Sequence, residues 1–180
     1  ANAGNSIASG GNYNVLIGDE AGTAITTGDS NVAVGFEALK TEDADGKTTA
    51  VGFQALKTQN AGADSNNTAV GYAAGAANTT GTYNTFIGSE AGEANTTGAN
   101  NTAVGALALE STTEGTNNTA IGQASLFENT LGSKSIAVGR GTLQNQNPTT
   151  ATDMFNTAVG HEAGNDITTG NLNTLIGGNA

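Results

Sequence analysis

Residues 84–98 read Asn84-Thr-Phe-Ile-Gly-Ser-Glu-Ala-Gly-Glu-Ala-Asn-Thr-Thr-Gly98, and variants of this stretch recur along the whole chain. An Ile-Gly or Val-Gly dipeptide marks each copy. Seven of the nine spacings between the marker glycines are 17 residues, and the other two are 19 and 21. Such a period predicts a solenoid, in which equivalent positions of successive turns stack on one another. The marker glycines are Gly18, Gly35, Gly52, Gly71, Gly88, Gly105, Gly122, Gly139, Gly160 and Gly177.

Composition alone would predict disorder, and the period overrules it. Leu, Ile, Val and Phe supply 31 of the 180 residues, and the formal net charge is −11. A chain with so little apolar surface is usually unable to offset its conformational entropy. Disordered low-complexity sequence, however, does not hold a spacing of 17 residues over ten copies.

The residues between the glycines predict short strands and tight corners. A second glycine follows the marker by ten residues in most copies, so each turn has two corners. The four residues before the marker form one strand, and we number them positions one to four. A second strand is expected in segments such as Glu90 to Thr97. The sequence therefore predicts an all-β, parallel β-solenoid of about ten 17-residue turns.

Alternation along the strand places positions two and four on one side and position three on the other. Position four is always Ile or Val, and we assign it to the core of the roll together with position two. Position three then points away from that core, although it holds no polar residue. An apolar stripe of this length would be a liability in water, so we expect it to pack against copies of the same chain. This candidate trimer interface is Leu16, Ala33, Ala50, Ala69, Phe86, Ala103, Ala120, Ala137, Ala158 and Leu175.

Two stretches resemble a known repeat almost letter for letter: Gly28-Asp-Ser-Asn-Val-Ala-Val-Gly35 and Gly132-Ser-Lys-Ser-Ile-Ala-Val-Gly139. They are similar to the head repeat of trimeric autotransporter adhesins, the YadA-like head, and to repeats of phage tail-fibre proteins. The resemblance covers essentially the whole chain. It implies a left-handed β-roll, three chains around a central axis, and an adhesive or fibre role at a cell or virion surface. It thereby implies an extracellular location and a protein or glycan receptor on a host surface.

Other function classes find little support in the residues. The chain has no Cys and one His, and it carries no phosphate-loop, dinucleotide or calcium-loop motif, so we expect no cofactor, no metal site and no enzyme. Asp43 and Asp45 are the nearest approach to a catalytic carboxylate pair. With 16 acidic and five basic residues, the chain would repel nucleic acid. No apolar run approaches the roughly 18 residues that span a bilayer.

The two long turns, residues 53–71 and 140–160, interrupt an otherwise regular domain that we expect to occupy residues 1–180 as a fragment of a longer chain. Because loops carry function on a repetitive scaffold, the longer one is a candidate partner-contact loop. Its candidate residues are Gln144, Asn145, Pro148, Met154 and Phe155.

One alternative function rests on threonine. Thr68, Thr85, Thr102 and Thr119 stack over four turns, as on an ice-binding face. The Val and Ile that alternate with them are expected to point inward, which weakens this alternative.

Overall fold

The computed structural model describes residues 2–7, 10–44 and 46–180, and these residues form no helix. Ten three-residue strands of the described chain build one sheet, and two further strands of two residues pair beside it. The sheet contains β1 (Val15–Ile17), β2 (Val32–Val34), β3 (Thr49–Val51), β4 (Thr68–Val70), β5 (Thr85–Ile87), β6 (Thr102–Val104), β7 (Thr119–Ile121), β9 (Ile136–Val138), β11 (Thr157–Val159) and β12 (Thr174–Ile176). The pair consists of β8 (Gly132–Ser133) and β10 (Thr152–Asp153).

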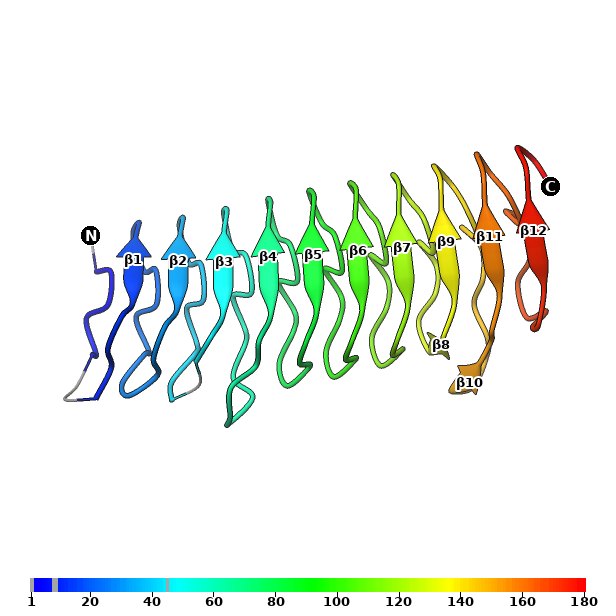
Figure 1. Cartoon of the computed structure of the whole chain (residues 1–180). Helices are drawn as coiled ribbons and strands as arrows, with labels where there is room; N and C mark the ends of the chain where they lie inside the picture. The colour runs from blue at the N-terminus through cyan, green and yellow to red at the C-terminus, as the bar shows by residue number, and fades with distance from the viewer. Residues whose placement is uncertain (1, 8–9, 45) are drawn as a thin grey trace.

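The strands are parallel and follow one another in chain order, so the molecule is a rod of stacked turns (Figure 1). Each strand pairs with the equivalent residues of the next, for example Thr85 with Thr102 and Phe86 with Ala103. Ten strands joined by nine connections make about nine turns. The prediction of an all-β parallel solenoid is confirmed.

The marker glycine is required at its corner by the neighbouring turn. Gly105 has φ of 132°, a conformation that residues with a Cβ rarely adopt. A Cβ on Gly105 would also lie 2.7 Å from the carbonyl carbon of Gly122 in the next turn. The same approach recurs from turn to turn, which explains why this position is invariant within the chain.

The return path of each turn differs from the sequence prediction, because residues 90–97 form no strand. Glu90 and Gly92 have φ of 57° and 59°, so the backbone coils rather than extends. Its N–H groups are nevertheless paired with neighbouring turns: Glu90 donates to the carbonyl of Tyr72 at 2.8 Å and Gly92 to that of Ala108 at 2.9 Å. Stacking therefore satisfies the backbone without a second sheet.

Buried asparagines at position one link successive turns. Asn84 accepts a hydrogen bond at Oδ1 from the Asn101 backbone N–H at 2.9 Å, and its Nδ2 donates to the Gly98 carbonyl at 2.8 Å. Asn101 repeats both contacts one turn later, with Asn118 and Gly115. The carboxamide thus ties each turn to the next and closes its own corner.

Position three faces the interior of the roll, which contradicts the predicted trimer interface. Ala33, Ala50, Ala69, Phe86, Ala103, Ala120, Ala137 and Ala158 are completely buried within the single chain, and Leu16 and Leu175 pack against the same core. A turn of 17 residues encloses a narrow space, so the strand contributes mainly alanine to it. The assignment of positions two and four to the core is wrong for the same reason.

Large and small residues are matched across this interior. Where the strand offers Ala103 or Ala120, the residue four positions after the marker glycine is a buried leucine, Leu109 or Leu126. Where the strand offers Phe86, that position is Gly92, and a Cβ there would overlap the phenyl ring. The core is close-packed in this way although the residues of individual turns differ.

We predict that Gly92→Ala destabilises the protein by more than about 2 kcal/mol, because the new methyl group overlaps Phe86. In a Phe86→Ala background the same change should cost only the left-handed backbone strain of about 1–2 kcal/mol. Denaturant unfolding of the four variants measures the difference. Gly62→Ala is the control, since Gly62 has φ of 73° with nothing within 4 Å of its added Cβ. An equal cost in both backgrounds would contradict the packing described.

A second row of buried side-chain amides lies seven residues after the marker glycine, and it is interrupted once. Asn78 and Asn95 are stacked, with Asn95 Nδ2 donating to Asn78 Oδ1, but the next turn holds Thr112. Among the described residues, buried Asn95 Oδ1 accepts no hydrogen bond.

We predict that Thr112→Asn raises the free energy of unfolding by about 1 kcal/mol, because its Nδ2 supplies the missing donor. Thr112→Val removes the hydroxyl without supplying an amide and should lower it. Thermal unfolding compares both variants with the parent. A Thr112→Asn protein no more stable than Thr112→Val would show that the row is not extended.

Candidate functional site

The side chains at positions two and four form the outer face of the sheet, the side seen in Figure 1. Position four is apolar in every turn. It is exposed in six strands, for example 40% at Ile87, 41% at Ile121 and 38% at Val70, and half-buried in the other four. Position two is threonine in seven of the ten strands and mostly half-buried. We call these two columns together the outer face. Position two consists of Val15, Val32, Thr49, Thr68, Thr85, Thr102, Thr119, Ile136, Thr157 and Thr174; position four consists of Ile17, Val34, Val51, Val70, Ile87, Val104, Ile121, Val138, Val159 and Ile176.

The residues that share each side of the strand were predicted correctly from the sequence, but the side that faces inward was predicted wrongly. Alternation fixes which residues share a side and does not fix which side is inward. The signal that decides it is size: β-branched residues in every turn would overfill so narrow a roll, whereas alanine opposite leucine fits. The apolar column on the outside is therefore position four, and the candidate contacts shift from alanine to valine and isoleucine.

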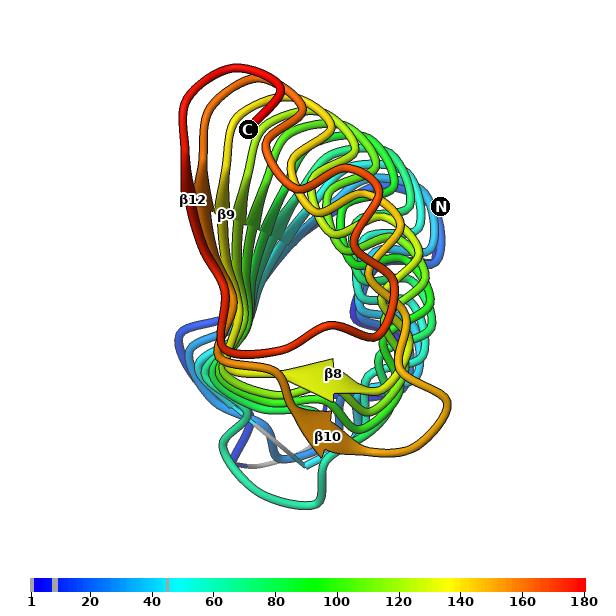
Figure 2. The ribbon, with the colours of Figure 1, turned by 90° about the vertical axis from the view of Figure 1, so that its right-hand side faces the viewer.

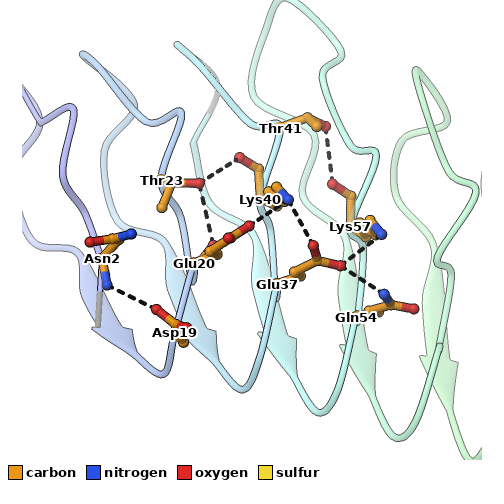
Figure 3. Close-up of polar contacts among 9 residues, drawn as sticks. All are labelled: Asn2, Asp19, Glu20, Thr23, Glu37, Lys40, Thr41, Gln54 and Lys57. Atoms are coloured by element: carbon orange, nitrogen blue, oxygen red, sulfur yellow. Dashed lines mark hydrogen bonds and ion pairs between the residues drawn. The ribbon is translucent and has the colours of Figure 1, made fainter.

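A charged cluster lies on the return path of the first turns (Figure 3). The Lys40 ammonium contacts Glu20 Oε2 at 2.5 Å and Glu37 Oε1 at 2.7 Å, and Lys57 contacts Glu37 Oε2 at 2.7 Å. Gln54 Nε2 donates to Glu37 Oε2 at 2.7 Å. Hydrogen bonds from Lys40, then Lys57 and Gln54, lower the pKa of Glu37 to about 2. Contact with Glu20 and Glu37 raises the pKa of Lys40 to about 12.

The charges are less balanced farther along the rod. Burial, followed by the neighbouring carboxylates Glu90 and Glu110, raises the pKa of Glu93. Stacking of equivalent positions therefore places like charges together wherever the sequence does not alternate them.

The predicted partner-contact loop is largely packed into the rod. Pro148 and Met154 are buried, Gln144 and Asn145 are half-buried, and Phe155 is 49% exposed. The Lys134 ammonium lies 5.2 Å from the centre of the Phe155 ring and 2.7 Å from Asp153 Oδ2. Figure 2 shows this excursion, with β10, projecting from the stacked turns. Of the five candidates, Phe155 is the one that offers a large exposed surface.

The remaining candidates for chemistry are dispersed. His161 lies at the surface beside Arg140 and Glu162, and Asp43 is exposed, while Asp45 lies outside the described residues. Residues 2–7, 10–44 and 46–180 bring together no group of three or more His, Cys, Asp or Glu that could hold a metal ion. A hollow at the C-terminal end is lined by Ile167, Leu175 and neighbouring residues of the last turns. Within the described chain, no helix has the length and apolarity needed to cross a membrane.

Comparisons with protein-family models, with curated proteins and with solved structures find no match to this chain.

We predict that thermal stability falls as the pH is lowered from about 4.5 to about 2, the ordinary and folded-state pKa values of Glu37. A carboxyl with a lowered pKa stabilises the fold when ionised, and that contribution is lost as protons bind to the folded state. Glu37→Gln should lower the melting temperature at pH 7 and flatten part of the acid decline. Glu114→Gln, at an exposed position, serves as the control. If the melting temperatures of the parent and of Glu37→Gln fell equally with pH over this range, Glu37 would not be the group responsible.

Proposed function

We propose that this chain is a segment of a non-enzymatic, homotrimeric surface fibre or adhesin head that spaces or presents attachment to a host cell or surface. Three copies pack around a common axis through their outer faces. The observation that carries the proposal is the apolar position-four column, which lies on the outside of a single chain and is exposed in six of the ten strands and half-buried in the other four.

The length and regularity of this column favour a partner of the same kind. Ten strands at about 4.8 Å give a face on the order of 50 Å long, and soluble monomers rarely expose a continuous apolar patch of this extent. A second copy offers the same repeat. Rotation about an axis parallel to the rod brings equivalent turns together in every subunit. The number three comes from the resemblance to trimeric adhesin heads.

In such an assembly the rod acts mechanically, as an extracellular spacer for a binding activity. The excursion over residues 149–153, which is mostly exposed, offers each subunit one projecting contact for a host-surface protein or glycan. A virion tail-fibre segment with the same assembly is the alternative within this class.

A second candidate function, ice binding, gains from one observation. Thr85 and Ile87 lie on the same outward side of the sheet, as do Thr102 and Val104. The Val and Ile beside the threonine column are therefore outside the core. An uncovered face of regularly spaced hydroxyl and methyl groups suits an ordered water surface. This role requires the outer face to be free, whereas the fibre role requires it to be covered.

We predict that light scattering of the purified chain gives three times its 17.6 kDa mass, about 53 kDa. The double substitution Ile87→Asp and Ile121→Asp should yield monomers, because it would bury carboxylates in the apolar face. The control is Thr97→Asp with Thr169→Asp, two exposed positions away from the outer face.

A parent chain that is monomeric at micromolar concentration would overturn the fibre proposal. If that monomer also showed thermal hysteresis, the ice-binding role would replace it. If the double aspartate variant remained a trimer, the trimeric assembly would stand and the outer face would be excluded as its interface.

A further inference from the structure

Six of the eight Phe and Tyr residues of the chain lie in two columns that flank the outer face. They are Tyr13, Phe36, Phe53, Tyr72, Tyr83 and Phe155, and each is at least 41% exposed. Exposed aromatic side chains gathered along one surface are typical of protein interfaces.

The two columns lie at opposite ends of the strands. One directly follows the marker glycine, and we call it the glycine edge: Asp19, Phe36, Phe53, Tyr72, Ser89, Ala106, Gln123, Arg140, His161 and Gly178. The other directly precedes position one, and we call it the asparagine edge: Tyr13, Ser30, Lys47, Asn66, Tyr83, Asn100, Asn117, Lys134, Phe155 and Leu172. Figure 1 shows these ends above and below the row of arrows.

Each edge has a regular geometry. All ten residues of the asparagine edge have positive φ, between 51° and 61°, which turns the chain sharply before the strand. On the glycine edge, Phe36, Phe53 and Tyr72 stack with ring centres 5.3 Å apart and interplanar angles of 23° and 8°. The stack is a local feature of three turns.

The aromatic residues of the two edges avoid one another within a turn. Phe36, Phe53 and Tyr72 share their turns with Ser30, Lys47 and Asn66, and Tyr13 and Tyr83 share theirs with Asp19 and Ser89. No turn carries Phe or Tyr at both edges. Pairing the edges in register would therefore place each ring against a smaller or polar side chain.

We propose that adjacent copies in the fibre meet edge to edge and in register, with the glycine edge of one copy against the asparagine edge of the next. The inference rests on the proposed homotrimer. Rotation about an axis parallel to the rod preserves height along it, so Phe53 of one copy lies level with Lys47 of its neighbour. Each contact joins two different surfaces, and three such contacts close the ring of subunits.

The chemistry of this contact has a precedent within the chain. Lys134 holds its ammonium over the Phe155 ring while it remains paired with Asp153. Lys47 is likewise paired with Asp64, and its aliphatic stem and ammonium are available to an aromatic face from the next copy. Together the two edges extend the apolar outer face into a continuous interface.

Cysteine cross-linking tests the register directly, because the chain has no native cysteine. Asn117 and Gln123 are exposed residues of the two edges in one turn. Strand β7 separates them, and at about 3.3 Å per residue the stretch from Asn118 to Gly122 alone spans on the order of 13 Å, whereas a disulfide needs Cα atoms within about 7 Å. Any bond between them is therefore intermolecular. We expect Asn117→Cys with Gln123→Cys to form covalent trimers under mild oxidation, seen on a non-reducing gel and reversed by reductant.

Two matched pairs serve as controls. Asn66→Cys with Gln123→Cys uses the same edges three turns out of register, and Gln123→Cys with Glu128→Cys replaces the asparagine edge by another exposed position. Neither should give covalent trimers. A trimer by light scattering that cross-links no better through the in-register pair than through these controls would overturn the edge pairing while leaving the fibre proposal standing. A monomer by light scattering would overturn both.

Discussion

The small space enclosed by a 17-residue turn is the constraint on which the structure depends. Successive turns approach so closely at the marker corner that a Cβ on Gly105 would collide with Gly122. Inside, the strand supplies alanine opposite leucine in turns such as those of Ala103 and Ala120, and Phe86 opposite Gly92. The β-branched residues of the strands at positions two and four lie on the outside. The same constraint that builds the turn therefore leaves an apolar column on the outside of the sheet.

Polar contacts replace much of the apolar core that the composition lacks. The rows of Asn84, Asn101 and Asn118 lie inside the roll, and each carboxamide bonds to the backbone of the next turn. A buried amide that loses its partner is costly, so slippage by one residue would penalise the whole row. The asparagines thus fix the register of the stack as well as stabilise it, which reconciles an ordered rod with a disorder-like composition.

The period and the strand residues could be predicted from the sequence because stacking repeats them in every turn. Val104-Gly105 and its equivalents fix the corner, and the alternation at Thr102–Val104 fixes which residues share a side. Two features could not be read in this way. Alternation is symmetric with respect to inside and outside, so the burial of Ala103 required the width of the roll. The coiled path at Glu90 and Gly92 depends on positive φ at alternate residues, one of which is not glycine, and local propensity gives little sign of it.

Among the candidate site residues, the sequence located the two long turns but not the packing of Met154 and Pro148 within one of them. A single methionine and a single proline stand out as sequence features, yet an insertion in a solenoid must itself be anchored, and these side chains provide the anchor. Phe155 remains exposed because its left-handed backbone turns it outward at the strand end.

The central claim is that the outer face, with Ile87 and its equivalents, is covered by copies of the same chain while Phe86 stays inside its own roll. A crystal structure of the purified protein in its assembled state tests this most directly. We expect three parallel rods, with β5 and its neighbours facing a common axis and equivalent turns at equal height. Rods whose outer faces contact only solvent, or that meet through the alanine column, would contradict it.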